Sequence, residues 1–415
     1  MVKNKTIAAL DVGSSKVAAL IAQINEEGKV NVTGASAVPA KGIKRGQIIN
    51  LEQATEAVIG ALEAAERMAG FHIRELNVAI GGAHIVSQNS RGVVAVANSG
   101  GDISEEDVAR VAEAAQAISL PASREIFHAI PRLYTVDSQE GIADPVGMSG
   151  VRLEVETHII TASSTAISNL QKCISEAGAT VDKLAFNALA SAAAVLTPTE
   201  KELGVILVDI GGGTTSVIIF HESSPIFSLV LPIGAQNITN DLAVGLRLSI
   251  EQAERLKVKL GEKERKENDI LKEFGLAGKE KKITIKTITQ EIIRPRLEEI
   301  FGMISDEVKH NNFTDIAPAG VVLTGGGAQT VGAVELARST MALPVRIGVP
   351  QGITGLVDDI LTPEFSALIG LVLLAQEEEK EKHHFNFNQI GKKIPNLPLR
   401  DSWEKVIKMV KSFLP

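Results

Sequence analysis

The stretch Val205–Phe220, VILVDIGGGTTSVIIF, decides the fold. An apolar, β-branched run reaches an acid, Asp209, and is followed by three glycines, two threonines and a second apolar run. This order predicts a buried strand, a tight turn and an antiparallel return strand. Because glycine has no Cβ, the turn brings backbone N–H groups close to an anion, and the threonines add hydroxyl donors. A carboxylate beside such a turn suits a divalent cation held through its water shell. The alternative is an ordinary glycine-rich hairpin.

The same pattern occurs near the N-terminus. The apolar run Thr6–Leu10 leads into DVGSSK (Asp11–Lys16), and a second apolar run, Val17–Ile24, follows. Two copies that lie nearly half the chain apart predict a duplicated α/β fold whose halves close on one polyphosphate from opposite sides. Lys16 either neutralises phosphate charge or is a solvated surface lysine.

Composition limits the classes of function. The 415 residues are 45% hydrophobic and 22% charged, with a net charge of −8, which predicts a soluble globular protein with two or more domains and argues against bulk nucleic-acid binding. Cys173 is the single cysteine, so no internal disulfide forms and a reducing cytosol is expected. We expect Cys173 to be a buried core thiol. Neither a signal peptide nor a membrane-spanning stretch is expected.

The first half combines a long helical pattern, an irregular region and an alanine-rich helical run. A helix is predicted over Leu51–Ala69, capped by Asn50 and stopped by Gly70. From about His84 to Glu156 short alternating strands surround one helix, which indicates an inserted small domain. The alanine-rich run Leu189–Leu196 predicts a closely packed helix that links the two halves.

The second half repeats the alternation of strands and helices. A short strand is predicted over Ile283–Ile285, and a helix over Ile288–His310 that Pro295 kinks. A buried strand then runs into Thr324-Gly325-Gly326-Gly327, with a helix expected from Ala328. This turn either lets a flat ligand approach the backbone or is a bare strand-to-helix connection. The apolar run Ser366–Ala375 predicts the second linking helix.

The C-terminal region changes in composition at Gln376. The charged and then proline-punctuated stretch up to Pro398 is predicted to be a flexible tether, in which His383 and His384 are solvated rather than metal ligands. A helix is predicted over Leu399–Pro415 with an apolar face and a basic face, as in helices that lie in a membrane interface. Docking onto the core or onto a partner is the alternative. The residues expected to bind the membrane are Trp403, Val406, Ile407, Val410, Phe413, Leu414, Lys405, Lys408 and Lys411.

The energetics of this tail suggest assembly. Burying an apolar side chain contributes about 1.5–3 kcal/mol, but insertion is partial and ordering a short helix opposes it. One tail should therefore bind weakly and reversibly. An array of subunits would bind much more tightly because it raises the effective concentration of tails.

Taken together, the two Asp-x-Gly hairpins, the TGGG turn and the two linking helices resemble the actin-like ATPase superfamily. Within it, the chain resembles the FtsA family of bacterial division proteins over nearly its whole length. The segments DVGSSKVAAL, GIKRGQIINLE and PRLYTVDSQEGIADPVGMSGVRLEVETHIIT (Pro131–Thr161) carry this resemblance together with the tethered tail. It implies two core lobes around an ATP cleft, an FtsA-type insert on the first lobe and a cap on the second.

The resemblance also implies domain boundaries. These are residues 1–83 with 157–193 and 365–375 for subdomain 1A, 84–156 for the inserted subdomain 1C, 194–237 with 287–364 for subdomain 2A, 238–286 for subdomain 2B, 376–398 for the flexible linker and 399–415 for the amphipathic membrane-targeting helix.

Ligand residues follow by motif from the same resemblance. It implies Asp11, Gly13, Ser14, Ser15 and Lys16 for the first phosphate loop. The second loop would comprise Asp209, Gly211, Gly212, Gly213, Thr214 and Thr215, with Gly234 beside it. Asp11 and Asp209 would hold Mg²⁺ through water. The adenosine would contact Gly325, Gly326, Gly327, Glu254 and Lys257.

The implied function is an ATP-binding, polymerising protein of the division septum. The 2B cap would bind the C-terminal peptide of the tubulin-like protein FtsZ, and the tail would hold FtsZ filaments on anionic lipids at the cytoplasmic face of the membrane, with other division proteins as further partners. Asn187 stands where some actin relatives carry an acid that positions the attacking water, so at most slow ATP hydrolysis and no catalytic residue are expected. A PilM-like pilus-assembly protein, a small-molecule kinase of the same fold and a chaperone relative are the alternatives.

Overall fold

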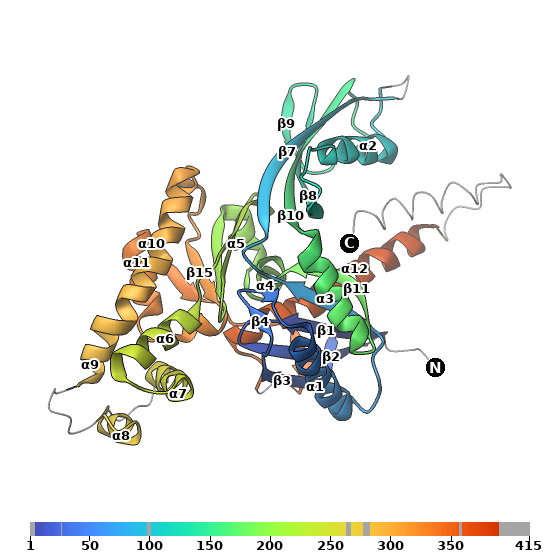
Figure 1. Cartoon of the computed structure of the whole chain (residues 1–415). Coiled ribbons are helices and arrows are strands. Elements are labelled where there is room, and N and C mark those ends of the chain that lie inside the picture. The colour runs from blue at the N-terminus through green and yellow to red at the C-terminus, as the bar shows by residue number, and fades with distance from the viewer. Residues whose placement is uncertain are drawn as a thin grey trace.

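The chain folds into two lobes and a smaller inserted subdomain (Figure 1). The computed structural model describes residues 5–25, 27–97, 101–262, 267–276, 283–356 and 359–389. The first lobe is built on a sheet of β1 (Lys5–Val12), β2 (Lys16–Ile24), β3 (Val30–Pro39), β6 (Glu75–Ile80), β11 (Thr180–Phe186) and β17 (Ile353–Gly355). The second lobe is built on β12 (Val205–Ile210), β13 (Thr215–His221), β14 (Ser224–Leu231), β15 (Val321–Thr324) and β16 (Val345–Ile347).

The two sheets share one topology over five strands, and β17 extends the first sheet beyond β3. The strand orders are β11-β6-β1-β2-β3-β17 and β14-β13-β12-β15-β16. In each lobe the first strand pairs antiparallel with its hairpin partner and parallel with the strand that follows a helical excursion: β1 with β2 and β6, β12 with β13 and β15. This repeat confirms the duplicated α/β fold that the two Asp-x-Gly stretches predict.

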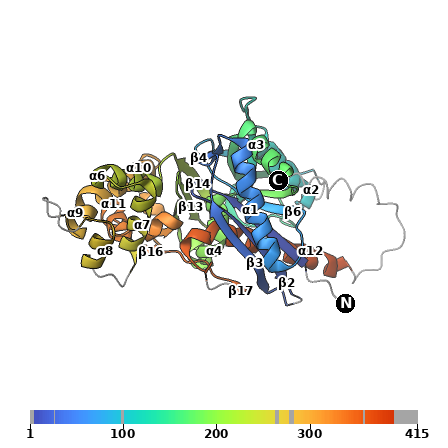
Figure 2. The same cartoon turned by 60° about the horizontal axis from the view of Figure 1, so that its bottom comes forward.

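Helices cover the first sheet on both faces. Figure 2 shows α1 (Leu51–Ala69) lying across β2 and β3. The predicted ends of α1 are confirmed, because the Asn50 side chain accepts a hydrogen bond from the Gln53 N–H and Gly70 adopts a left-handed φ of 82°. On the same side, α3 (Ser164–Glu176) packs on α1 and β11 and buries the Cys173 thiol.

Two helices link the lobes. The helices α4 (Asn187–Val195) and α12 (Ser366–Gln389) pack on each other between the two sheets, and the hydrophobic core that contains them includes buried residues of both sheets. They cross at Gly370, where an added Cβ would lie 1.8 Å from the carbonyl oxygen of Ala190. Only glycine fits this crossing, so the position fixes how closely the linking helices approach.

The linking helix α12 is longer than the sequence pattern predicts. The expected tether from Gln376 onward is wrong up to Gln389, where α12 ends. The stretch is rich in Glu and Lys, which favour helices, and has no Gly or Pro before Gly391. An ion pair between Lys183 and Glu378 also ties the extension to β11. The predicted membrane helix, 399–415, lies outside the described residues.

The second lobe contains most of the remaining helices. They are α6 (Ala235–Leu246), α7 (Ile250–Gly261), α8 (Glu267–Glu273), α9 (Ile285–Ile288), α10 (Arg294–His310) and α11 (Ala333–Met341), while α5 (Pro198–Leu203) precedes β12. One expectation here is wrong. Ile285 begins α9 instead of ending a strand, because the Thr284 hydroxyl caps that helix by accepting from the Thr287 N–H.

The helix expected over Ile288–His310 is confirmed in extent, because α9, a π-helical turn, Thr289–Ile293, and α10 follow one another without a break. The Arg294 N–H donates to the Thr289 carbonyl. Pro295 lies in the first turn of α10, directly after the π-helical turn, so the local irregularity of the helix is next to the proline.

The inserted subdomain is a sheet with one helix on it. Its strand order is β7-β10-β8-β9, and the bounds are β7 (Val86–Ala95), β8 (Arg124–Val136), β9 (Gln139–Ile142) and β10 (Arg152–Ser163), with α2 (Glu105–Gln116) packed on β7. Ser104 and Asp107 form a capping box at the start of α2. Because β10 (Arg152–Ser163) is continuous, the expected boundary at residue 156 falls inside a strand, which runs from the insert into the first lobe.

A polar seam joins the insert to the second lobe. The imidazole of His158 on β10 is fully buried and contacts Asn89 Oδ1 through Nδ1 at 2.7 Å and Ser228 Oγ through Nε2 at 2.9 Å. Ser87 Oγ donates to the Ser228 carbonyl at 2.7 Å and accepts from the Ser228 N–H at 3.0 Å. Burial lowers the pKa of His158 to about 3, so its ring is neutral at physiological pH. These contacts fix β7 beside β14, the strand that leads to the turn before α6.

Candidate functional site

The two predicted hairpin turns have the same internal geometry. In the first, the Gly13 N–H donates to the Lys16 carbonyl at 3.0 Å, and in the second the Gly211 N–H donates to the Thr214 carbonyl at 2.9 Å. In both, the acid lies on the strand just before the turn, at Asp11 and Asp209. The duplicated sequence pattern therefore folds into duplicated turns, one in each lobe.

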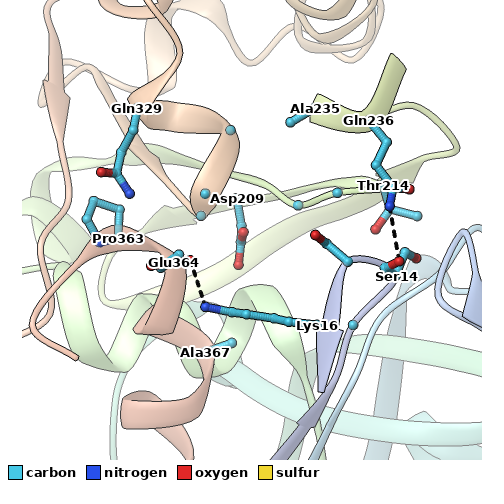
Figure 3. Close-up of a pocket in the computed structure, with 18 of the residues that line it drawn as sticks. Ser14, Lys16, Asp209, Thr214, Ala235, Gln236, Gln329, Pro363, Glu364 and Ala367 are labelled. Carbon is cyan, nitrogen blue, oxygen red and sulfur yellow. Dashed lines mark hydrogen bonds and ion pairs between the residues drawn. The ribbon is translucent and has the colours of Figure 1, made fainter. Parts of the chain in front are cut away.

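The two turns face each other across the junction of the lobes. A Cβ added to Gly212 would lie 2.8 Å from Ser15 Cβ, and one added to Gly213 would lie 2.7 Å from Ser14 Oγ. The side-chain amide of Gln236 donates to the Ser14 carbonyl at 3.2 Å, which Figure 3 shows as a dashed line. Glycines are required in the second turn because the first turn packs directly against it.

A cavity of about 350 Å³ lies between the turns. This volume is within the range of sites for small-molecule ligands. The predicted site residues that line it are Asp11, Gly13, Ser14, Ser15, Lys16, Asp209, Gly211, Gly212, Gly213, Thr214, Glu254, Lys257, Gly325, Gly326 and Gly327. Segments as far apart as Asp11 and Gly327 thus meet at one cavity, as the sequence predicts.

Two predicted residues do not line the cavity. Thr215 is fully buried, and its hydroxyl donates to the Ile233 carbonyl at 2.8 Å. Gly234 lies behind the second turn, where an added Cβ would be 2.6 Å from the carbonyl oxygens of Gly211 and Gly212. Both residues therefore support the second turn from the side away from the cavity: Thr215 through its hydrogen bond in the core, and Gly234 through its close packing on the turn carbonyls.

The two acids dominate the electrostatics of the cavity. Asp209 is 6% exposed and accepts a hydrogen bond from the Ser191 hydroxyl at 2.7 Å. Burial raises the pKa of Asp11 and of Asp209 to about 6, and the neighbouring Asp11 charge adds to the rise at Asp209. The ammonium of Lys16 opposes the shift in both. Burial disfavours the charged form of both carboxylates, so a bound cation would stabilise their charged forms.

The third glycine turn comes close to the acid of the second lobe. Gly325 has a left-handed φ of 79°, and an added Cβ would lie 2.3 Å from Asp209 Oδ1. The helix expected from Ala328 is a 3₁₀ helix, Gly326–Gln329, and α11 begins only at Ala333. Gly327 packs closely against Ile210, so there is room at this point only for a tight 3₁₀ turn.

The pair Glu254 and Lys257 is not an ordinary surface pair. Lys257 is 7% exposed, and its ammonium donates to Glu254 at 2.8 Å, to the Thr239 hydroxyl at 2.9 Å and to the Ala235 carbonyl at 3.2 Å. Burial lowers the pKa of Lys257, and the Glu254 charge opposes this. The pair holds α7 against the start of α6 and leaves the Glu254 carboxylate at the cavity wall.

Lys16 lies in the cavity and is paired there. Its ammonium is 2.9 Å from Glu364 Oε2, a contact that Figure 3 shows as a dashed line. The ammonium also lies 3.4 Å from the centre of the Phe365 ring. Glu364 and Phe365 belong to the short 3₁₀ helix η4 (Pro363–Phe365) that precedes α12. The sequence left open whether Lys16 is a solvated surface lysine, and its 21% exposed side chain decides against that.

Sequence reasoning missed several lining residues. Glu364, Gln236 and Gly46 all line the cavity, and Ser191 holds Asp209. Gly46 lies in the GIKRG turn, and its N–H donates to Ser14 Oγ at 2.9 Å. The signal for Glu364 was its position just before the predicted linking helix; for Gln236, its position two residues after Gly234.

The donor set suits a hydrated cation beside a polyphosphate. Among the described residues, no group of three or more His, Cys, Asp and Glu side chains forms a cage for a metal ion. The carboxylates that line the cavity come from separate segments, with Asp11 and Asp209 on different lobes, and residues of three glycine turns lie between them. Mg²⁺ commonly keeps several waters and binds through one or two carboxylates together with substrate phosphates.

No described helix is long and apolar enough to cross a bilayer.

Comparisons with known proteins agree with this arrangement. Residues 82–161 match the family model of the SHS2 domain inserted in FtsA, and residues 206–370 match that of the cell division protein FtsA. The FtsA proteins of Pseudomonas aeruginosa and Bacillus subtilis are 37% and 35% identical to the chain. The first alignment covers 91% of this chain and 91% of the relative, and the second covers 97% and 89%.

Solved structures show the same fold at low sequence identity. The PilM–PilN type IV pilus biogenesis complex matches with a TM-score of 0.64 and 17% identity over 90% of this chain and 99% of the other. MreB5 of Spiroplasma citri bound to AMPPNP matches with a TM-score of 0.53 and 14% identity over 92% and 99%. The structural matches establish an actin-like ATPase fold, and the sequence matches establish that the chain belongs to the FtsA family of cell division proteins.

Proposed function

We propose that the chain binds one ATP with Mg²⁺ between the two hairpin turns and self-associates in its ATP-bound form. The observation that carries this proposal is the pair of mirrored turns that meet at one cavity of about 350 Å³. The Gly211–Gly213 turn and the Gly13–Ser15 turn supply backbone and hydroxyl donors from opposite lobes. A polyphosphate held by both turns would favour one relative position of the lobes.

Each cavity residue has a role in this proposal. Asp11 and Asp209 orient the hydrated Mg²⁺, which neutralises phosphate charge when bound. The turn at Gly325–Gly327 lies against the base, and Glu254 and Lys257 lie against the ribose and base. Lys16 adds positive charge at the phosphates.

Slow hydrolysis follows from the residue at the start of α4. Asn187 lines the cavity, and its Oδ1 is buried without a hydrogen-bond partner among the described residues. An amide oxygen can hold a water but cannot accept its proton at neutral pH, so the chain lacks a general base there. The nucleotide therefore controls lobe closure and assembly more than it serves turnover.

Membership of the FtsA family supports the proposed partners. In this proposal the 2B cap, residues 238–286, binds the C-terminal peptide of FtsZ. Residues 399–415 bind anionic lipids on the cytoplasmic face of the cell membrane at the division site. The assembled array thereby tethers FtsZ filaments and recruits other division proteins, since many weak tails bind tightly together.

The proposal is tested in two steps. A fluorescent ATP analogue with Mg²⁺ should bind the full chain and fail to bind Asp11→Asn, while the exposed-site control Asp182→Asn binds normally. Anionic vesicles should then float FtsZ with the full chain and Mg-ATP, but not with a chain that lacks residues 399–415. Unchanged analogue binding by Asp11→Asn contradicts the ATP site, and FtsZ flotation by the truncated chain contradicts the tether.

A further inference from the structure

The ion pair at Lys16 joins three parts of the cleft. Lys16 begins β2 in the first lobe, and its partner Glu364 lies on η4, just before α12. The same short segment is bonded to the second lobe: the Gly325 N–H donates to the Pro363 carbonyl at 3.0 Å. Behind it, the hydroxyls of Thr324 and Ser366 lie 2.6 Å apart in the core. The segment 363–366 therefore holds the TGGG turn and Lys16 at once.

The pair competes with any phosphate that would use Lys16. A lysine ammonium on the cavity wall has one charge to offer, and Glu364 occupies it at 2.9 Å. A phosphate that binds Lys16 would meet the Glu364 carboxylate next to it, and like charges at such a distance repel. The Glu364 side chain is 42% exposed, so it can turn into water without burying its charge.

We propose that Glu364 is a displaceable anion that holds Lys16 in the cleft and leaves it when a polyphosphate binds. This inference rests on the proposed ATP site and names a residue that regulates it. Glu364 acts through Lys16 and is therefore a positioning residue. Phe365 keeps the ammonium in place after the exchange, because the ring contact at 3.4 Å does not depend on the Glu364 charge.

The exchange loosens one of the links between the lobes. With the ion pair formed, Lys16 of β2 is tied to the start of the linking helix α12. With a phosphate on Lys16, that tie is gone, and the segment stays attached to the second lobe through Pro363 and Ser366. Nucleotide binding would then change the contacts at the start of α12, the helix that extends to Gln389.

A double-mutant cycle tests the competition. Affinity for a fluorescent ATP analogue with Mg²⁺ is measured for the unmodified chain, Glu364→Gln, Lys16→Met and the double variant, with exposed Glu335→Gln on α11 as the control for a lost surface charge. Circular dichroism confirms that each variant is folded. Glu364→Gln should lower the Kd about three- to tenfold in the presence of Lys16, because the phosphate then no longer competes with Glu364 for the ammonium. The effect is small because an exposed ion pair is weak. The same substitution should change the Kd less than twofold in the Lys16→Met background.

The outcomes separate this inference from the proposed function. If the unmodified chain does not bind the analogue, the ATP site itself is refuted, and this inference with it. If the chain binds and Glu364→Gln leaves the Kd unchanged or raises it, only the competition is refuted. An equal gain in both backgrounds also refutes it, since it would show general charge repulsion that does not act through Lys16.

Discussion

Replacing the buried acid of the second lobe should stabilise the empty protein and abolish its response to Mg-nucleotide. Asp209→Asn keeps the size of the side chain and an oxygen that accepts from the Ser191 hydroxyl, now at 2.7 Å. The substitution removes a carboxylate that is 6% exposed and lies near the charge of Asp11. It therefore removes a buried charge without creating a cavity.

The magnitude follows from the pKa of Asp209, which burial raises from 3.8 to about 6. A rise of this size corresponds to about 3 kcal/mol of lost folding free energy once the group is ionised in both states. Because the folded pKa is the higher one, the stabilising effect of the proton is complete below about pH 4 and is lost as the pH rises to about 6. Asparagine does not titrate, so its gain of about 1–3 kcal/mol should appear at pH 8 and disappear near pH 4.

Urea unfolding of the empty protein at pH 8 and pH 4 measures this effect. The exposed strand residue Asp182→Asn is the matched control and should change stability by less than about 0.5 kcal/mol at both pH values. Thermal unfolding with and without Mg-ATP then measures ligand stabilisation, which should be present in the control and absent in Asp209→Asn. A variant that is less stable than the unmodified chain at pH 8, or one with the same gain at both pH values, would refute the reasoning.

Three further predictions concern the linking helices, the seam and the tail. Gly370→Ala should destabilise the chain by about 1–3 kcal/mol in urea unfolding, because its Cβ would overlap the Ala190 carbonyl. The control Gly302→Ala on α10 has open space around the added Cβ and should be neutral or stabilising. Equal effects of the two substitutions would contradict the close crossing of the helices. His158→Ala should cost about 2–4 kcal/mol and expose the joint between insert and second lobe to limited proteolysis, since it leaves buried partners unpaired; an unchanged digestion pattern would argue against the seam. Emission of Trp403, the only tryptophan, should shift to the blue when anionic liposomes and Mg-ATP are added, and an unchanged spectrum at high lipid would contradict the membrane assignment.

Local sequence signals predicted the hairpins and the capped helices well. The strand, turn and return strand around Asp209 follow from an apolar run interrupted by glycines, and each part lies within a few residues of the next. The same holds for α1, whose ends at Asn50 and Gly70 are set by capping side chains and glycine. Repetition of the hairpin pattern then supplied the duplicated fold.

Long-range contacts were not predictable from local pattern. Lys16 and Glu364 are separated by 348 positions, and neither sequence context says which partner a charged side chain finds. The polar seam around His158 is missed for the same reason, because its partner Ser228 looks like an ordinary strand serine. The extension of α12 was missed because a run of Glu and Lys is equally typical of a solvated tether and of a charged helix.

Calorimetric titration of Mg-ATP into the full chain tests the central claim most directly. The claim is that one nucleotide is held by both lobes at once, through Asp11 and Asp209 on mirrored turns. The account predicts one site per chain. Binding heat should be lost in Asp11→Asn and equally in Asp209→Asn, since each substitution removes one of the two carboxylates of the same site. Full binding in either single variant, or no binding by the unmodified chain, would contradict it.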